Sequence, residues 1–423
     1  MFFINDKPIR LIELFAGIGS QAKALTNLGV NFEHWRVCEF DEHAIRSYNA
    51  VHGTDFVTSD VTMLRASDLE ITQTDQFTYL LTYSFPCVDL SNAGKGAGMA
   101  KGSGTRSGLL WEVERLLNEC TELPQVLLME NVPQVHGAKN KAHFDQWIAF
   151  LESKGYSNHW QDLNAKDYGI PQSRNRCYMV SILGDYAYEF PAPIPLEKKL
   201  GDVLDAVVDE RYYLTDDRCQ RIAHWNAQQN PLEKVNGSES ICPTITARGA
   251  GEYHSGMILF SPHLTNTANL RGTVLQREVC NRAVDLTKPY EMIDYTYSNA
   301  RLKEIENGET LLVRNRGDAS ISCTLTTKPE NFAVRVPNDM FRVITPLESW
   351  RLMGFDDSDF ERAQAVCDDR QLYKQAGNSI VVNVLMAVFA QLFAPHMTDQ
   401  VHTEGLPPEA FMAEPELIED WML

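Results

Sequence analysis

The segment SFPCVDLS, residues 84–91, contains a cysteine that follows a proline and precedes a glycine-rich run. Cysteine suits covalent attack near neutral pH, because its thiolate is strongly nucleophilic even when it is scarce. The following residues, NAGKGAGMAKGSG, predict a mobile loop, and loops of this length are usually functional or disordered. An isolated cysteine is more often a small buried hydrophobic residue. The interpretation of Cys87 as a nucleophile therefore needs support from the rest of the sequence.

That support comes from the ends of five predicted strands, each of which holds a chemically useful residue. They are Phe15, Gly17 and Gly19 after the first strand, Glu39 at the end of the second, Asp60 after the third, Cys87 after the fourth, and Glu130 with Asn131 at the end of the fifth. In open α/β sheets, ligands bind beyond the carboxyl ends of the strands. Five strand ends that all carry such residues therefore indicate a site more strongly than any one of them alone.

The strands that position these residues alternate with helices. Apolar or β-branched runs predict strands at 9–15, 34–40, 55–60, 77–85, 125–132 and 176–183. Helical spacing, capping acids and terminal glycines predict helices at 21–29, 41–53, 106–120 and 141–155. This alternation predicts an α/β fold with a mixed, mostly parallel sheet covered by helices on both faces.

The alternation stops at FPAPIP, residues 190–195, which marks a domain boundary. We expect a first domain at 1–190, a second at 191–340, a segment at 341–396 that completes the first domain, and an acidic tail at 397–423. Two similar stretches near 240 and 320 are either ordinary edge strands or related strands of one recognition module. The apolar run IVVNVLMAVFAQLF is too short and too polar to span a bilayer and predicts a buried helix.

Composition sets further limits. The chain has 423 residues, 44% of them hydrophobic, and a net charge of -19, which argues mildly against a basic nucleic-acid coat but allows a local basic cleft. Its nine cysteines include no CxxC pair, so neither a zinc module nor another metal site is expected. Scattered thiols and the absence of a signal-like N-terminus predict a cytoplasmic protein, with no membrane association.

The first loop, FAGIGS, lacks both the GxGxxG pattern and a Walker lysine. Its glycines would let the backbone approach a ligand, although a simple tight turn would explain them too. Glu39 is placed to accept ribose hydroxyls, and Asp60 could receive an exocyclic amine. An adenosine pocket without a phosphate cradle indicates S-adenosylmethionine as the cofactor, with S-adenosylhomocysteine as its product.

Taken together, these motifs resemble those of the cytosine-C5 DNA methyltransferases, in the family's order and in two blocks at about 9–185 and 341–393. The matching segments are ELFAGIGS, CEFDEHAIRSYN, SDV, FPCVDLS, GTRSGLLWEVERLL, ENV, QSRNR and YKQAGNSIVV. The resemblance implies a class I methyltransferase, Rossmann-like fold, and places a mostly β or irregular target-recognition domain at 191–340. One departure is Val88, where the family usually has glutamine, which affects how the gap left by an extruded base is filled.

The resemblance also implies site residues, on the positions that match the family's motifs. The catalytic set is Cys87, Glu130, Arg174 and Arg176; the cofactor set is Phe15, Ala16, Gly17, Gly19, Glu39, Phe40, Asp60, Pro86, Asn378, Ser379 and Val381; the DNA contacts are Ser91, Lys95, Lys101 and Arg106. The implied substrate is double-stranded DNA, bound by a monomer in the bacterial cytosol or nucleoid. A cognate restriction endonuclease, or a role in phage self-protection, is left open.

The chemistry explains why those residue types are needed. Addition of the Cys87 thiolate to cytosine C6 activates C5 for methylation, while Glu130 meets the developing charge at N3 and the two arginines orient the carboxylate and the base. The cytosine must first be flipped out of the duplex. The base that finally removes the C5 proton is not identified, and water is one candidate.

Three other functions compete with this one. An RNA cytosine methyltransferase of similar fold should have a much smaller specificity region, a non-enzymatic relic should have lost Cys87 or Glu130, and a NAD enzyme should carry GxGxxG. The target sequence cannot be read from the chain. Arg248, Arg314 and Arg316 are candidate groove or phosphate contacts, and each could equally be a solvated surface arginine.

Overall fold

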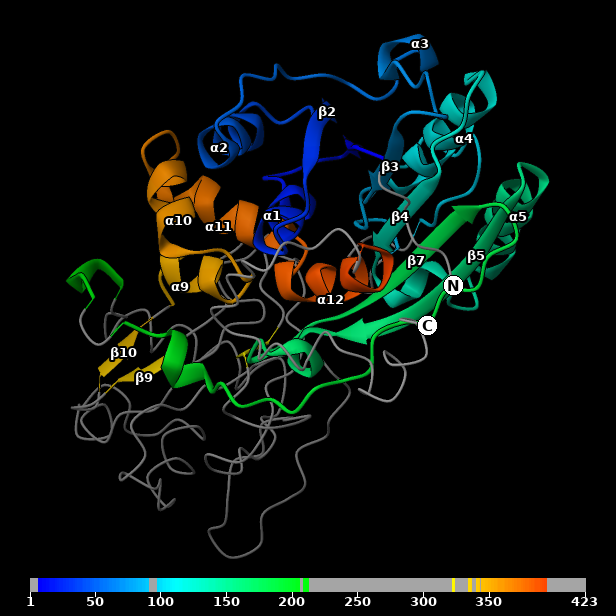
Figure 1. Cartoon of the computed structure of the whole chain (residues 1–423). Helices are drawn as coiled ribbons and strands as arrows, with labels where there is room; N and C mark the ends of the chain where they lie inside the picture. Colours follow the sequence, from blue (N-terminus) through cyan, green and yellow to red (C-terminus); the bar gives the residue numbers. More distant parts are fainter. Residues whose placement is uncertain are drawn as a thin grey trace, which may run out of the picture.

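The computed structural model describes residues 7–90, 97–205, 208–212, 322–323, 334–336, 340–342 and 344–393. Its centre is a six-stranded sheet in the order β2-β1-β3-β4-β7-β5 (Figure 1). These strands are β1 Ile9–Leu14, β2 Phe32–Cys38, β3 Thr78–Tyr83, β4 Val126–Asn131, β5 Tyr156–Asn164 and β7 Asn175–Leu183. β1 to β4 run parallel, and β7 runs antiparallel to both β4 and β5. The predicted mixed, mostly parallel sheet is therefore confirmed.

Helices cover both faces of this sheet, as predicted. α1 (Ser20–Asn27) and α12 (Val382–Phe393) lie side by side on one face, although they come from opposite ends of the chain (Figure 1). α4 (Leu110–Glu119) and α5 (Lys141–Ser153) pack on the other face. The remaining helices are α2 Glu42–His52, α3 Ala66–Leu69, α9 Pro346–Arg351, α10 Asp357–Gln364 and α11 Asp369–Asn378. Short 3-10 turns are η1 Ser107–Leu109, η2 Pro133–Val135, η3 Ala165–Tyr168, η4 Leu200–Val203 and η5 Glu210–Tyr212.

Two hydrophobic clusters sandwich the sheet, because successive side chains of a strand point to opposite faces. In β1, Leu11 packs into the cluster that contains α1 and α12, whereas Ile12 packs into the cluster that contains α4 and α5. In β4, Leu128 and Met129 divide in the same way. This alternation determines on which face of the sheet the side chain of each residue at a strand end lies.

The structure corrects the strand prediction at two places. Residues 55–60, predicted as the third strand, are irregular, and Val57 is exposed there. No strand of the described residues pairs with them: the Ser59 N–H donates to the carbonyl of Glu39 at 2.9 Å, and Phe56 exchanges hydrogen bonds with the Asn49 side chain. Conversely, the edge strand β5 was not predicted, because its polar sequence, YSNHWQDLN, lacks the apolar alternation of a half-buried strand.

The segment from 344 to 393 packs against the first 190 residues. Lys23 of α1 forms an ion pair with the buried Asp359 of α10, at 2.8 Å, and the Gln172 amide donates to the carbonyl of Leu352. α12 is almost entirely buried, as predicted. No helix in the described part of the chain is by itself long and apolar enough to cross a membrane; α11 and α12, bent by 40°, reach that length and composition only as a pair.

Little of the predicted second domain falls within the described residues. Those beyond 190 include β8 (Ser322–Cys323), which pairs in parallel with β6 (Gln172–Ser173), and an antiparallel pair formed by β9 (Val334–Val336) and β10 (Met340–Arg342). The tail from 397 onward, the two similar stretches near 240 and 320 apart from β8, and the candidate arginines at 248, 314 and 316 lie outside them. The domain boundaries therefore stay a prediction.

Candidate active site

β1 and β3 are adjacent parallel strands. The chain order of the strands reverses between them, because β2 lies on the other side of β1 and β4 on the other side of β3. In open α/β sheets such a reversal opens a crevice at the carboxyl ends of the strands, and ligands bind there. The loop that follows β1 begins at Phe15, and the turn that follows β3 carries Cys87. The topology therefore brings two of the predicted motifs to the same edge of the sheet.

The loop after β1 has an unusual backbone. Phe15 has a φ of 59°, a left-handed conformation that is uncommon for a side chain of this size and marks a constrained position. Gly17 also has positive φ, and a Cβ built on it would meet nothing within 4 Å, so open space lies beside its backbone. A Cβ at Gly19 would instead come within 2.3 Å of His52 Nε2, so this glycine is needed for packing. Ala16 is buried, and its N–H donates to the carbonyl of Cys38.

Glu39 ties this loop to the end of β2. Its Oε2 accepts from the Gly17 N–H and its Oε1 from the Asp41 N–H, both at 2.9 Å. Burial raises the pKa of the Glu39 carboxyl, and these backbone donors oppose the rise. The next residue, Phe40, leaves 73% of its surface exposed. The acid that is bonded to the Gly17 backbone is thus followed directly by an uncovered aromatic ring.

Asp60 belongs to the same edge, although it does not follow a strand. Its Oδ1 accepts from the N–H and the hydroxyl of Thr62, at 2.9 and 2.8 Å, so a local turn holds the side chain. The bond between Ser59 and Glu39 fixes this turn beside the end of β2. The structure therefore brings together the first loop, Glu39, Phe40 and Asp60.

Cys87 is half-buried on the turn after β3. Burial raises the pKa of its thiol, the guanidinium groups of Arg176 and Arg174 lower it, and the Glu130 carboxylate raises it. All three charged groups thus lie within electrostatic reach of the sulfur. The proline before the cysteine, Pro86, accepts through its carbonyl a hydrogen bond from the Ser107 hydroxyl at 2.6 Å.

Glu130 occupies the end of β4 and forms an ion pair with Arg176, with 3.4 Å between Oε1 and Nε. The two side chains are only 10% and 12% exposed. Burial raises the pKa of Glu130, whereas the two arginines and a hydrogen bond with Ser84 lower it. The adjacent residue, Asn131, donates through Nδ2 to the carbonyl of Phe85 and so joins the end of β4 to the Cys87 turn.

Arg174 is buried and joins the C-terminal segment to this site. One of its guanidinium nitrogens donates to the carbonyls of Gly377 and Ser379, at 3.1 and 2.7 Å. Burial and the neighbouring Arg176 lower the pKa of Arg174 to about 9. Both arginines lie near the carboxylate, but Arg176 makes the ion pair whereas Arg174 braces the turn between α11 and α12.

The residues of that turn differ in their accessibility. Asn378 is exposed, whereas Ser379 is buried and its hydroxyl donates to the carbonyl of Gln375. The Val381 side chain is 1% exposed and packs in the core beside α12. Among these three predicted cofactor residues, only Asn378 therefore presents an open side chain.

The predicted DNA contacts are only partly within the described residues, because Ser91 and Lys95 lie outside them. Lys101 forms an ion pair with Glu114 at 2.5 Å and lies 5.4 Å from the centre of the Trp111 ring. Arg106 is exposed, and its backbone N–H is engaged by Asp89. Arg106 thus keeps an open side chain, whereas the charge of Lys101 already has a partner.

Asp89 is a feature that the sequence analysis missed. Its Oδ2 accepts from the N–H groups of Arg106 and Ser107, at 2.8 and 3.3 Å, and so caps the start of η1 from a distant part of the chain. Its own N–H donates to the Ser107 hydroxyl, and its carbonyl accepts from the Gly98 N–H at 3.0 Å. Asp89 thereby holds the two ends of the glycine-rich loop together, two residues after Cys87. Nothing in the local sequence distinguishes such a clasp from a solvated acid.

Replacing Asp89 with alanine should loosen this clasp. We expect the free energy of unfolding to fall by about 1 kcal/mol, as for the loss of a helix cap, and kcat to fall roughly tenfold, because small displacements of a reacting group are costly. Asp89→Asn retains an acceptor oxygen and should recover most of both losses. Denaturant unfolding and steady-state kinetics of the two variants test this; equal kcat in wild type and Asp89→Ala would contradict it.

The comparison with known protein families decides the identity of the fold. The family model for C-5 cytosine-specific DNA methylases matches residues 9–394. The chain belongs to this family. It is a DNA cytosine-5-methyltransferase, as the motifs predicted, and methyltransferases of this family generally take their methyl group from S-adenosylmethionine.

Individual relatives agree over almost the whole chain. The type II methyltransferase M2.ScrFI of Lactococcus lactis subsp. cremoris is 26% identical over 91% of this chain and 99% of its own. The orphan methyltransferase M.SPBetaI of Bacillus phage SPbeta is 26% identical over 93% and 99%. The structure of the Entamoeba histolytica methyltransferase EhMeth aligns with a TM-score of 0.57 at 18% identity, over 92% of this chain and 99% of that one. This last likeness confirms the Rossmann-like methyltransferase fold.

Proposed function

We propose that this protein methylates C5 of a flipped-out cytosine in duplex DNA through a transient covalent bond between Cys87 and C6. The observation that carries the proposal is the convergence of Cys87, Glu130, Arg174 and Arg176 at the sheet edge where the strand order reverses. A nucleophile, an acid and two cations within reach of one another are what addition to a pyrimidine requires.

The addition step uses Cys87 and Glu130 together. The thiol gives up its proton, and the thiolate Sγ bonds to C6 while the C5–C6 double bond opens. Glu130, in its protonated form, transfers a proton to N3, so that no charge accumulates on the ring. Burial of Glu130 favours that protonated form, and Arg176 at 3.4 Å holds the carboxyl in place.

The enamine formed in this way has a nucleophilic C5, which accepts a methyl group. A base then removes the C5 proton, the C5–C6 double bond re-forms, and the sulfur leaves C6. Glu130 recovers its proton from N3, and one proton is released to solvent overall. No described side chain is assigned as the final base, and water is the candidate.

The loop after β1 and the residues around it suit an adenosine-containing cofactor. The open space beside Gly17 admits a ligand close to the backbone, Glu39 offers carboxylate oxygens for ribose hydroxyls, and the exposed Phe40 ring offers an apolar surface. Asp60 would receive the adenine amino group, and Phe15, Ala16, Gly19, Pro86, Asn378, Ser379 and Val381 complete the proposed set. S-adenosylmethionine, when bound, supplies an electrophilic methyl carbon. The chain's residues orient it towards the turn that carries Cys87.

Base flipping is required because C5 and C6 lie inside the stacked duplex. Val88, next to the nucleophile, is 42% exposed and is an apolar candidate for contact with the space that the cytosine vacates. The exposed Arg106 is a candidate phosphate contact at the base of the loop. Ser91, Lys95 and Lys101 are proposed contacts of the same kind. To bind a phosphate, Lys101 has to break its ion pair with Glu114 or bind both groups at once.

Replacing Glu39 with glutamine should weaken cofactor binding. A charge-assisted hydrogen bond contributes about 1.5–3 kcal/mol, so we expect the KM for S-adenosylmethionine to rise by roughly 10- to 100-fold with little change in kcat. Glu33→Gln is the matched control, because Glu33 lies on β2, which ends one residue before Glu39, and its side chain is exposed. Calorimetric titration of the cofactor checks the affinity directly, and unchanged binding by Glu39→Gln would refute the assignment.

The proposed substrate is tested by incubating the full chain with S-adenosylmethionine carrying a labelled methyl group and either duplex DNA or tRNA. Label at cytosine C5 of DNA alone is the expected result, and label in tRNA alone would assign the chain to RNA. Bisulfite sequencing of DNA from expressing cells then gives the target sequence.

Among the relatives are both type II and phage orphan methyltransferases. A role in self-protection, with or without a cognate endonuclease, fits a monomer whose chemistry needs no partner.

A further inference from the structure

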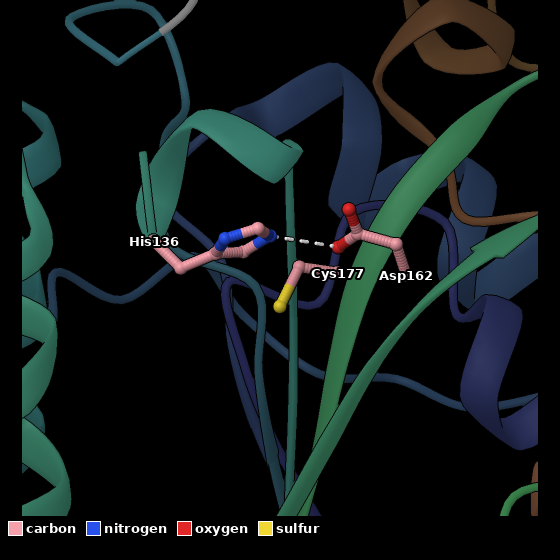
Figure 2. Close-up of side chains that lie close together, drawn as sticks. All are labelled: His136, Asp162 and Cys177. Carbon is pink, nitrogen blue, oxygen red and sulfur yellow. Dashed lines mark hydrogen bonds and ion pairs between the residues drawn. The ribbon is translucent and has the colours of Figure 1, made fainter. Parts of the chain in front are cut away.

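A second cluster of reactive side chains lies outside the active site. His136 follows η2, Asp162 belongs to β5 and Cys177 belongs to β7, and their nitrogen, oxygen and sulfur atoms lie within 4.8 Å of one another (Figure 2). His136 Nε2 is 3.0 Å from Asp162 Oδ1. Asp162 and Cys177 are direct cross-strand partners in the antiparallel β5–β7 pair. Among the residues that the structure describes, these form the only such group that could hold a metal ion.

The three side chains lie on the opposite face of the sheet from the ion pair between Glu130 and Arg176, although Cys87 packs against the same hydrophobic cluster as Cys177. Cys177 packs into the hydrophobic cluster that contains α4 and α5, whereas its neighbour Tyr178 packs into the cluster that contains α1 and α12. Adjacent strand residues point to opposite faces, so Cys177 also points away from the side of Arg176 and its ion pair with Glu130. The mechanism proposed above uses none of the three side chains.

Two aromatic side chains pack beside the His136 imidazole. The Trp160 ring lies 4.7 Å from the His136 ring at an interplanar angle of 34°, and Phe144 of α5 lies 6.2 Å away. Trp160 and Phe144 also contact each other edge-on at 5.4 Å. Such an apolar shell restricts the orientation of a ligating side chain and lowers the local dielectric constant.

The donor set fits a zinc-class divalent cation. Imidazole nitrogen, carboxylate oxygen and thiolate sulfur are the ligands that zinc takes in proteins, at about 2.0–2.3 Å. Tetrahedral geometry at those bond lengths places ligand atoms ~3.3–3.7 Å apart. The observed separations are 3.0 Å between His136 Nε2 and Asp162 Oδ1 and no more than 4.8 Å for any pair, values that bracket this range. The His136 and Asp162 side chains are 25% and 30% exposed, so an ion can enter from solvent, and a water can take the fourth position.

We propose that His136, Asp162 and Cys177 bind one zinc-class divalent cation. Binding replaces the hydrogen bond between His136 and Asp162 with bonds to the ion, and the Cys177 thiol releases its proton to solvent as its sulfur coordinates. The alternative is a cluster held by its own hydrogen bonds.

The ion would connect two segments that carry catalytic residues. His136 lies six residues after Glu130 along the chain, and Cys177 directly follows Arg176. A bound cation would therefore link the segment after β4 to β7 on the face of the sheet opposite the ion pair between Glu130 and Arg176. We expect the melting temperature to rise when the ion is added to chelator-treated protein.

Cobalt(II) titration of the chelator-treated full chain tests the proposal, because sulfur-bound cobalt has a near-ultraviolet charge-transfer band. The background is the Cys87→Ser variant, which removes the half-buried active-site thiol. Adding Cys177→Ser to this background should reduce the amount of sulfur-bound cobalt by one equivalent per chain. Zinc should displace that cobalt. Cys120→Ser, which removes another half-buried thiol at the end of α4, is the matched control and should change nothing.

Two further variants keep the test decisive if Cys177→Ser does not fold. Asp162→Asn and His136→Gln preserve size at partly exposed positions, and each should weaken cobalt binding at this site by roughly tenfold or more. Equal numbers of sulfur-bound equivalents with and without Cys177, or unchanged affinity in Asp162→Asn, would overturn the proposal. Neither outcome bears on methyl transfer, so the metal site and the proposed function stand or fall separately.

Discussion

Cys87→Ser is expected to reduce methyl transfer to DNA by roughly 10⁴-fold or more, since removal of a nucleophile from a covalent mechanism leaves only binding and orientation. The serine hydroxyl has nearly the same size but ionises far less readily than a thiol. The thiol is half-buried and shares its surroundings with Glu130, Arg174 and Arg176, so the substitution changes the reacting atom without opening a cavity. Transfer of a labelled methyl group to duplex DNA measures the loss.

The serine variant should keep its affinity for S-adenosylmethionine and its melting temperature. Cys120→Ser is the matched control, because it removes a half-buried thiol that lies at the end of α4 instead of at the Cys87 turn. That control should retain full activity. Cys87→Ser with activity within tenfold of wild type would exclude a covalent role for the thiol.

Glu130→Gln is expected to lower kcat by roughly 10²–10⁴-fold, the range that general acid catalysis contributes. Glutamine retains the shape and one carbonyl oxygen but has no proton to transfer to N3. The change also removes the carboxylate that lies 3.4 Å from Arg176, so part of the loss comes from a less ordered guanidinium. Single-turnover measurements separate chemistry from product release, and a normal rate in this variant would refute the acid role.

The pH dependence gives a sharper test of the same residue. The active form needs a protonated Glu130 and a deprotonated Cys87, and burial raises the pKa of both groups above their ordinary values of 4.5 and 9.0. Because a carboxyl is ordinarily far more acidic than a thiol, we expect the wild-type rate to rise with pH up to the Glu130 pKa and to stay level until the thiol ionises. In Glu130→Gln the level region should become a continuous rise, because only the thiolate fraction then matters. A level region that persists in the variant would exclude Glu130 as its source.

Much of the fold could be predicted from the sequence because apolar runs and terminal glycines mark buried strands and helix ends clearly. β3, β4 and β7 are buried over most or all of their length and were found from their apolar runs. β5 was missed because an edge strand with polar side chains has no periodic signal, although nine residues of it pair with β7. The segment 55–60 was wrongly predicted as a strand because a short run of apolar and β-branched residues says nothing of a pairing partner.

The site could be predicted in its residue types but not in its contacts. The sequence indicated Cys87 and Glu130 as members of one site, and the topology brings them to the same edge. It favoured Arg174 over Arg176 as the residue that orients the carboxylate, whereas Arg176 makes the ion pair with Glu130 and Arg174 braces the turn after α11. That division depends on packing between distant segments. The clasp formed by Asp89 depends on the same kind of long-range contact.

The central claim is a covalent bond between Cys87 and the cytosine ring. The most direct measurement incubates the protein and S-adenosylmethionine with duplex DNA in which 5-fluorocytosine replaces cytosine, because fluorine at C5 blocks the proton removal that frees the sulfur. We predict a complex that survives denaturing electrophoresis, with the DNA attached to the Cys87 peptide in mass spectrometry. No denaturant-resistant complex, with cytosine DNA of the same sequence being methylated in parallel, would contradict the mechanism.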